Sequence, residues 1–389
     1  MELATIFRRY SHRYLELYQG RIPKIHLKAL NDISNCRTDA FGGHIDRCDH
    51  CGYVHFFHHS CYNRSCPKCQ GIHTQKWLEK RKAEMLPLHY FHMVFTIPQE
   101  LYHIVHSKPK QLLDVLIKAA AQSLKKLMAD PKYGGGKPGF ITVLHTWTRS
   151  MEYHPHVHIL VAAVVIANSD SSNRSKEAMD TAVPVPVLLG KKFLVPIFAL
   201  SDIFRAIFIK MARKKLPDLQ FPQSIWKKRW VVYCKPTLKG GTNVIQYLAR
   251  YVYRIAITNN RILADHDGKI TFKYQACKDY KWKKLTLDAM KFMRRFLQHV
   301  LPPGVHKVRY YGFLAPGARH TLHSLRAVLN ENITAPQPSQ HPQSQSHHLL
   351  SANNCHNYRK CPICKIGNMV VIKHFFYRKY SSFCSRPPP

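Results

Sequence analysis

The segment HTWTRSMEYHPHVHILV, residues 145–161, limits most strongly the fold that this chain can adopt. Its second half alternates polar and apolar side chains around His156-Val157-His158, which is typical of a β-strand. On a strand, His156 and His158 share one face while Val157 belongs to the other. Two neighbouring imidazoles can bind one metal ion. The sequence therefore predicts a sheet that carries a histidine pair on one face.

A third histidine precedes this pair. Residues 141–148 (ITVLHTWT) are rich in β-branched and aromatic residues and predict another strand, joined to the first by a hairpin connection. If the turn centres on Met151 and Glu152, His145 lies opposite His158 and supplies a third ligand. Ordinary strand histidines would fit the same pattern. Three histidines on one hairpin favour the metal site.

The charge of the chain indicates its partner. Lys and Arg number 59 against 22 Asp and Glu, which gives a formal net charge of +37 over 389 residues. So large an excess repels itself unless a polyanion binds, and nucleic acid is the obvious candidate. The first residues are amphipathic and charged rather than a secretory signal, and no run of about 18 apolar residues could span a membrane. We expect an intracellular protein.

Twelve cysteines include two Cys-x2-Cys pairs in the N-terminal region, Cys48 with Cys51 and Cys66 with Cys69. The pairs predict two zinc knuckles that close one tetrahedral site, because clustered cysteines in a reducing compartment favour metal over disulfides. Four buried free cysteines are the alternative. A zinc ion would supply the folding energy that a small module lacks.

Further ligands surround these pairs. The N-terminal region holds candidates for a second zinc ion: Cys36, Cys61, His44, His55 and His58. Basic and aromatic residues interleave with them, as in a module that binds nucleic acid. A third pair, Cys361 and Cys364, predicts another small zinc site near the C-terminus, with other candidate ligands nearby: Cys355, His356, His374 and Cys384.

A second functional element spans residues 240–258, GGTNVIQYLARYVYRIAIT. Apolar residues recur every three or four positions and predict the buried stripe of a helix: Val244, Leu248, Val252 and Ile255. Tyr247 and Tyr251 are four residues apart and share a neighbouring face, with Arg250 and Arg254 close by.

The two tyrosines are candidate nucleophiles. A tyrosine hydroxyl, with a pKa of about 10, attacks poorly near neutral pH. Attack on a phosphodiester becomes feasible when a metal ion polarises the phosphate and arginines offset the developing charge. Half-buried tyrosines that steady the helix are the alternative. Together with the histidine motif, the tyrosines predict a site that cuts DNA and holds its 5′ end as phosphotyrosine.

The remaining pattern predicts an α+β fold with an antiparallel sheet and flanking helices. We expect a buried strand in residues 85–98, an amphipathic helix over 109–128, a strand running into a helix over 193–215, and a strand at 229–236. Residues 272–314 are basic and aromatic, which suits a groove for unpaired bases.

The predicted organisation has four parts. Residues 1–85 form N-terminal helices and a zinc-binding domain that contacts DNA, and residues 86–320 form the catalytic domain. Residues 331–354, rich in Pro, Gln, Ser and His, predict a disordered linker. Residues 355–389 form a small tail that contains cysteine and histidine.

The assembled motifs resemble the rolling-circle insertion-sequence transposases of the ninety-one family, which belong to the His-hydrophobic-His (HUH) superfamily of single-strand DNA endonucleases. The resemblance covers residues 20–320. It rests on five motifs: CRT-x3-GGH-x3-C-x2-CG, SC-x-NRSCPKCQ, LHTW followed by HPHVH, QYLARY-x2-R-x-AI, and TLDA-x2-F-x-RRFL-x-HVLP.

This resemblance implies an HUH-endonuclease-like sheet, with His156 and His158 as the metal-binding pair and Tyr247 and Tyr251 as the tyrosine motif. It implies that the cysteines of residues 36–69 form a zinc-binding domain. Such enzymes nick one strand, form a 5′-phosphotyrosine link, free a 3′-OH and transfer the held strand. Their metal is Mg²⁺ or Mn²⁺, although an all-imidazole site by itself would suit zinc or nickel better.

We therefore expect a bacterial, cytoplasmic, nucleoid-associated DNA transposase that acts mainly on single-stranded element ends and targets. His145 is the leading third ligand, and the alternatives are Glu152, Asn243 and Gln246. Arg250 and Arg254 are expected to contact phosphate.

Two other functions use the same features. A replication initiator or relaxase would share the chemistry. A non-catalytic, decayed zinc-dependent protein would bind DNA without forming a covalent adduct. A carboxylate nuclease is disfavoured, because only 22 acidic residues exist and none form an evident metal-binding trio.

Overall fold

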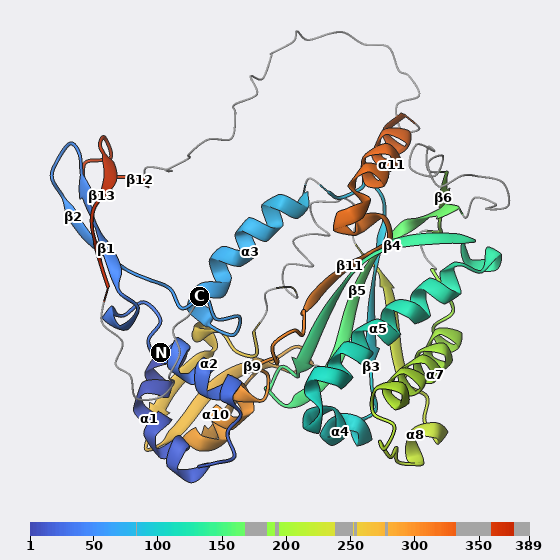
Figure 1. Cartoon of the computed structure of the whole chain (residues 1–389), viewed down its shortest axis with the longest axis horizontal. Coiled ribbons are helices and arrows are strands. Elements are labelled where there is room, and N and C mark those ends of the chain that lie inside the picture. Colours follow the sequence, from blue (N-terminus) through green and yellow to red (C-terminus); the bar gives the residue numbers. More distant parts are fainter. Residues whose placement is uncertain are drawn as a thin grey trace, which may run out of the picture.

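The computed structural model describes residues 1–82, 84–167, 185–190, 194–237, 252, 255–276, 279–331 and 359–376. Within these ranges the strands form three sheets, and the sheet with most strands carries the histidine motif. Figure 1 shows this sheet at one end of the molecule and a smaller sheet at the other. The architecture confirms the predicted α+β class with antiparallel sheets and flanking helices.

The main sheet is antiparallel at every described pairing. Its strands, in spatial order, are β11 (Val308–Tyr311), β4 (Gly136–Trp147), β5 (Tyr153–Ala167), β3 (Tyr90–Thr96) and β7 (Val231–Pro236), and β6 (Pro186–Leu188) pairs with β5. Most residues of β4 and β5 are buried on both faces, which explains their nearly continuous apolar sequence.

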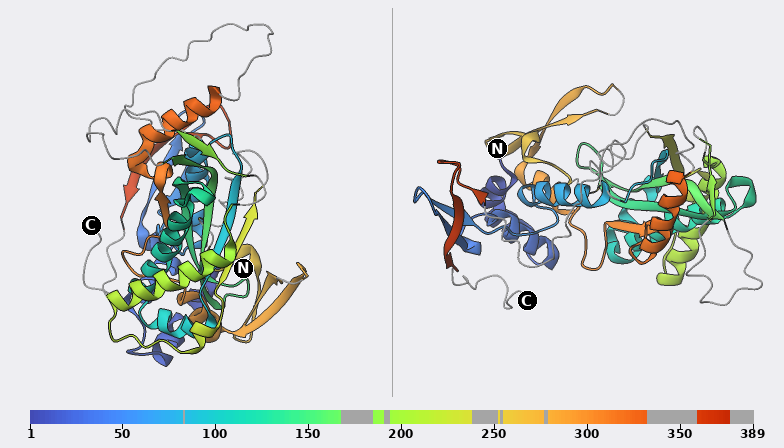
Figure 2. Two further views of the ribbon diagram at one scale, coloured as in Figure 1. Left: turned by 90° about the vertical axis from the view of Figure 1, so that its right-hand side faces the viewer. Right: turned by 90° about the horizontal axis from the view of Figure 1, so that it is seen from above.

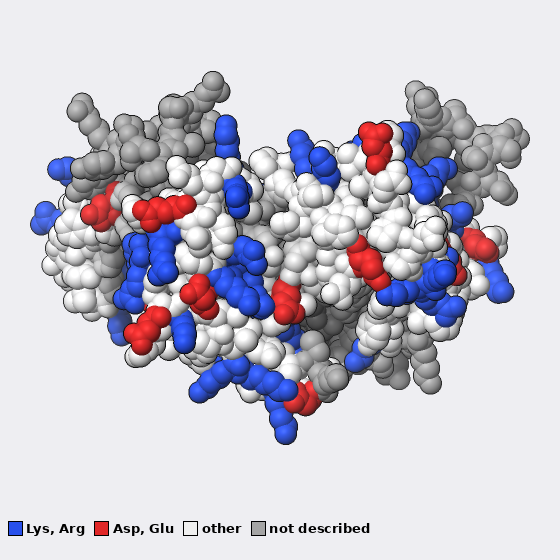
Figure 3. Space-filling view, turned by 90° about the horizontal axis from the view of Figure 1, so that it is seen from below, with Lys and Arg blue, Asp and Glu red and all other residues white. Residues whose placement is uncertain are grey.

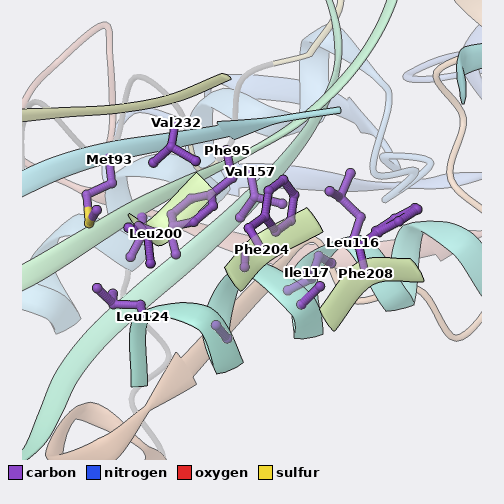
Figure 4. Close-up of a cluster of buried hydrophobic side chains, with 14 of the residues drawn as sticks. Met93, Phe95, Leu116, Ile117, Leu124, Val157, Leu200, Phe204, Phe208 and Val232 are labelled. Atoms are coloured by element: carbon purple, nitrogen blue, oxygen red, sulfur yellow. The ribbon is translucent and has the colours of Figure 1, made fainter. Parts of the chain in front are cut away.

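Two helices cover one face of this sheet, α5 (Pro109–Met128) and α7 (Ile197–Lys215). Figure 4 shows Phe204 of α7 and Leu116 of α5 packed with Phe95 and Val157 of the sheet. The bounds of α5 match the predicted helix, and Pro109 occupies its first turn, where a missing N–H costs nothing. No helix among the described residues is long and apolar enough to cross a membrane.

The strand predicted at the start of residues 193–215 is wrong for the part that the structure describes. Leu194 and Val195 have no strand pairing, although both are buried in the same core as α7. Pro196 then provides the N-cap of α7. A short buried apolar run cannot be assigned to a strand by periodicity alone.

The opposite face of the sheet packs against α11 (Arg319–Glu331) and the turn Gly312–Leu314. Val143 and Leu160 point to this face, whereas the intervening Leu144 and Val157 point toward α5 and α7. The alternation confirms the predicted separation of the two faces of the histidine strand. His145, His156 and His158 have the same parity as Val143 and Leu160, so they belong to the α11 face.

A second sheet packs against the N-terminal helices. It consists of β8 (Ile262–His266), β9 (Lys269–Gln275) and β10 (Trp282–Asp288), and its neighbours are α1 (Leu3–Leu17), α2 (Lys24–Ser34) and α10 (Ala289–Leu297). The Phe7 ring meets the Phe296 ring edge to face, with centroids 5.5 Å apart. Both views in Figure 2 show the β9–β10 pair projecting from the body of the molecule.

The third sheet combines the two ends of the chain (Figure 1). Its order is β12 (Arg359–Lys360), β13 (Asn368–Phe375), β1 (Gly43–Cys48) and β2 (Val54–His58), and α3 (Pro67–Lys82) follows β2 in the chain. Residues 359–375, which belong to the predicted C-terminal tail, therefore form part of a sheet with N-terminal strands. Pairing between such distant strands leaves no local signal in the sequence.

The aromatic core under the main sheet gives a direct test. Phe204 is fully buried, with its ring 5.2 Å from that of Phe95 and 5.3 Å from that of Trp230. We expect Phe204→Ala to lower the free energy of unfolding by about 3–5 kcal/mol, because it removes apolar contacts and leaves a cavity.

The matched control is Phe198→Ala on the same helix, because 59% of that residue is exposed. Its loss should be below about 1 kcal/mol. Urea-unfolding curves followed by circular dichroism would compare the two variants. Equal shifts in midpoint would contradict this packing arrangement.

Candidate functional site

The β4–β5 hairpin positions the three histidines. His145 on β4 pairs directly with His156 on β5, while His158 lies opposite Val143. The predicted register, with His145 opposite His158, is wrong by two residues along β5. The pairing shifts between His145 and Trp147, so the strands do not follow the simple count from the turn.

The turn itself differs from the prediction. Thr148 donates its N–H to the Glu152 carbonyl over 2.9 Å, so the loop is centred on Ser150 rather than on Met151 and Glu152. Met151 has a φ of 62°, a left-handed conformation that few side chains adopt. The Glu152 carboxylate lies 3.6 Å from Arg295 and apart from the three histidines.

Three imidazole nitrogens converge at the site. His158 Nε2 lies 3.1 Å from His156 Nε2 and 3.1 Å from His145 Nδ1. All three residues are buried, with exposed fractions of 3% for His145, 9% for His156 and 7% for His158. Nitrogens bound to one ion at about 2.1 Å would lie roughly 3.0–3.4 Å apart. The three histidines therefore have the spacing of a shared metal site.

Hydrogen bonds orient two of these rings. His156 Nδ1 lies 2.7 Å from the His154 carbonyl oxygen, which can only accept, so Nδ1 carries the proton and Nε2 the lone pair. His158 Nδ1 lies 2.9 Å from His92 Nε2. Burial, followed by the charge of Lys235, lowers the pKa of His92 to about 4, so His92 is neutral near pH 7. It can accept the Nδ1–H of His158, which leaves His158 Nε2 directed at the other two rings.

Sequence reasoning missed His92. His92 lies on β3, where Val94 pairs with His158. It is two residues before Val94, so its side chain lies on the same face of the sheet as that of His158. The alternation of residues 90–96 is the only local signal for it. That signal requires knowing that β3 neighbours β5, which motif spacing does not reveal.

The end of helix α10 and the two residues after it contact the hairpin turn. Gln298 donates to the Met151 carbonyl over 3.1 Å, and Arg295 donates to the Ser150 carbonyl over 3.3 Å. His299 is buried, and its two ring nitrogens lie 3.2 Å from Thr146 Oγ1 and 3.2 Å from the Met151 carbonyl. The RRFL-x-H motif thus fixes the turn that connects the histidine strands.

The tyrosine motif falls outside the described residues, together with the arginines and polar residues near it: Tyr247, Tyr251, Arg250, Arg254, Asn243 and Gln246. Val252 is described and is 2% exposed, in the apolar cluster on the histidine face. Ile255 lines a pocket with Trp147, whose ring stacks on His145 with centroids 4.7 Å apart. Val252 therefore lies on the histidine face of the sheet, and Ile255 lies near the Trp147 ring that stacks on His145.

Eight of the nine cysteines that the structure describes form two separate groups of four. Cys36, Cys61, Cys66 and Cys69 form one group, in which Cys69 Sγ lies 3.6 Å from Cys36 Sγ and 3.7 Å from Cys61 Sγ. The other group contains Cys48, Cys51, Cys361 and Cys364. Four sulfurs around zinc at about 2.3 Å would lie roughly 3.8 Å apart.

This grouping corrects the prediction that Cys48, Cys51, Cys66 and Cys69 close one site. Strand β1 carries the first pair away from the second pair, which begins α3 (Figure 1). Cys36 and Cys61 complete the set around Cys66 and Cys69 instead of forming another site. His44, predicted to join them, lies instead with His59 and His374.

Comparisons with known proteins agree with these features. A family model described as "Putative transposase" matches residues 139–321, and one described as "Transposase zinc-binding domain", of the IS91 type, matches residues 6–97. The first match includes the histidine hairpin and the tyrosine motif. The second includes the first group of four cysteines.

Two curated proteins are similar over most of their length. A protein of Sinorhizobium fredii described as "Putative transposase y4qJ" is 34% identical over an alignment of 397 positions, which covers 96% of this chain and 95% of that protein. The transposase for insertion sequence element IS801 of Pseudomonas savastanoi pv. phaseolicola is 24% identical over 316 residues, covering 77% of this chain and 72% of that protein.

No solved structure matches the chain significantly. The family therefore rests on the two domain matches, on one relative that aligns nearly end to end and on a second that aligns over 77% of the chain. On these grounds the chain belongs to the IS91 family of insertion-sequence transposases and has an N-terminal zinc-binding domain.

Proposed function

We propose that this transposase nicks and rejoins single-stranded DNA through a 5′-phosphotyrosine intermediate during rolling-circle transposition. One observation carries the proposal. Three buried imidazole nitrogens converge on the same sheet face that receives Val252, the residue directly after Tyr251. Because Tyr251 directly precedes Val252 in the sequence, the position of Val252 supports a tyrosine beside the histidine site.

The three histidines would hold the divalent ion, because the nitrogens of His145 and His156 each lie 3.1 Å from the same nitrogen of His158. The ion that we propose is Mg²⁺ or Mn²⁺, hard ions that would also bind the phosphate oxygens of the DNA. When bound, the ion would polarise the scissile phosphate.

The chain's own residues perform the bond exchange. A tyrosine Oη, from Tyr247 or Tyr251, attacks phosphorus and loses its proton to solvent. The bond from phosphorus to O3′ breaks, and that oxygen takes the electron pair and a proton to become the 3′-OH. Arg250 and Arg254 offset the charge on the phosphate oxygens. Attack by a target 3′-OH on the phosphotyrosine reverses the step and joins the strands.

The surface supports a nucleic-acid partner. Lys and Arg form several patches on the face in Figure 3, where Asp and Glu are fewer and scattered. On the arm β8–β10, Tyr280 is 67% exposed and Trp282 is 61% exposed, and Lys283 and Lys284 are exposed beside them. Exposed aromatic rings stack on unpaired bases, and lysines contact the backbone. This arm is our candidate surface for single-stranded DNA.

The metal role predicts graded effects of two histidine substitutions. We expect His158→Ala to abolish nicking of labelled single-stranded DNA, because it removes the central ligand. His92→Ala should lower the nicking rate by about 10–100-fold, because His92 only orients His158. Higher Mn²⁺ should partly restore the His92→Ala variant. His103→Ala, at an exposed position on α4 (Tyr102–Ser107), is the matched control. Wild-type nicking by His158→Ala would refute the site.

The tyrosine role is tested by mapping the covalent adduct. With Mn²⁺ and single-stranded DNA from the element's ends, we expect mass spectrometry to find DNA on a peptide containing Tyr247 or Tyr251. Replacing both by phenylalanine should remove the adduct, because no attacking oxygen is left. Tyr253→Phe keeps the aromatic content and should form the adduct normally. An adduct that survives the double substitution would disprove the assignment.

The arm predicts a separable loss of DNA affinity. Trp282→Ala should weaken binding of single-stranded DNA by about 1–3 kcal/mol, the contribution of one stacked base. Trp226→Ala, also partly exposed at 44%, lies on α8 (Ser224–Lys227) and should leave affinity unchanged. Fluorescence anisotropy at fixed salt would measure both. Equal losses would show that the arm has no special role.

A further inference from the structure

We infer that Cys48, Cys51, Cys361 and Cys364 bind one structural zinc ion that joins the two ends of the chain. Cys48 Sγ lies 3.7 Å from Cys364 Sγ, and Cys51 Sγ lies 3.6 Å from Cys361 Sγ. These separations are too long for disulfides, whose sulfurs lie about 2.05 Å apart. They match thiolates around tetrahedral zinc, at roughly 3.8 Å.

The two Cys-x2-Cys segments have the same backbone geometry. The residue after the second cysteine donates its N–H to the carbonyl of the first, Gly52 to Cys48 over 3.2 Å and Lys365 to Cys361 over 3.0 Å. Both residues have positive φ, 72° at Gly52 and 57° at Lys365. Lys365 adopts this conformation without the freedom of glycine. The matching turns point each cysteine pair at the other.

Backbone N–H groups also point at the sulfurs. Cys51 N lies 3.4 Å from Cys48 Sγ, and Gly367 N lies 3.4 Å from Cys364 Sγ. Such donors orient the sulfur, as outer-shell partners of metal ligands do. The backbone of each turn therefore supports a sulfur that faces the other cysteine pair.

Specific contacts lock the halves together. Asp49 donates its N–H to the Asn368 carbonyl over 3.1 Å, and Asn368 returns an N–H to Asp49 Oδ1 over 2.7 Å. A Cβ on Gly367 would lie 2.6 Å from Cys48 Sγ, closer than any side chain can approach. Only glycine permits this contact between the C-terminal turn and the N-terminal cysteine.

The site explains how the small sheet is stable. Among the described residues, its buried apolar cluster consists of Cys48, Cys361 and Met369. A two-stranded hairpin such as β1–β2 is marginal by itself in water. The ion and β13 together supply the missing stability, because the binding energy of a structural zinc is folding energy. The N-terminal zinc-binding domain is therefore completed by residues far outside the match to its family model.

Zinc content of the full chain tests the shared site. The doubly substituted chains Cys48→Ser/Cys51→Ser and Cys361→Ser/Cys364→Ser should each lose one zinc ion relative to the wild type. Combining all four substitutions should still cost only one ion, because both pairs serve the same site. Native mass spectrometry would count the ions. A loss of two ions in the fourfold variant, or no loss from Cys361→Ser/Cys364→Ser, would overturn the inference.

Two further variants serve as controls. Cys66→Ser/Cys69→Ser should lose a different ion, so adding it to Cys361→Ser/Cys364→Ser should cost two ions in total. Cys234→Ser should lose none, because Cys234 on β7 belongs to neither group. Neither readout depends on nicking, so this test and the test of the proposed function can fail independently.

Thiol reactivity gives a second measurement if a variant folds poorly. In the zinc-loaded wild type, iodoacetamide should modify Cys361 slowly, because a metal-bound thiolate is protected. Gly367→Val leaves all four ligands in place but blocks the contact, and it should raise the rate at Cys361 by about tenfold or more. Gly317→Val, where a Cβ meets no atom within 4 Å, should not change the rate. Equal rates in both variants would overturn the inference.

Discussion

The pairing of β4 with β5 is the interaction on which the candidate catalytic site depends. It places His145 against His156 and brings His158 within hydrogen-bonding distance of both. The same pairing buries the alternate side chains under α5 and α7, so a slip by one residue would move the histidines into an apolar core. The position of the site is thus held by the core packing of the whole sheet.

The molecule has a strongly basic surface, whereas His92 and His299 in its interior are neutral. The exterior carries most of an excess of +37, which favours binding to a phosphate backbone. Burial keeps His92 and His299 neutral, because it lowers the pKa of His92 to about 4 and that of His299 to about 3. Neutral imidazole can accept a proton or bind a metal, whereas imidazolium can do neither. A basic protein can therefore contain a buried site that binds a cation.

The sequence predicted the features that are encoded locally. Alternation placed His156 and His158 on one face, and the bounds of α5 followed from its proline and its apolar spacing. His145 lies with His156 and His158 although its predicted register is wrong, because residues two apart on a strand share a face whatever the count across the turn.

Features that depend on distant pairing were not predictable in this way. Each Cys-x2-Cys pair was identified, but spacing could not show that Cys48 and Cys51 meet Cys361 and Cys364. His92 was not predicted, because the sequence of neither strand shows that β3 lies next to β5. Local periodicity defines elements, whereas the choice of partner comes from the packing of the whole chain.

The sheet formed by the two ends of the chain also bears on its synthesis. Cys48 and Cys364 are separated by 316 positions. At roughly 5–20 residues per second, a ribosome needs about 15–60 s to travel that distance. For most of this interval β1 and β2 have been synthesised while β13 does not yet exist. The N-terminal hairpin therefore reaches its native sheet only after β13 has been translated, and a chain that stops before β13 never does.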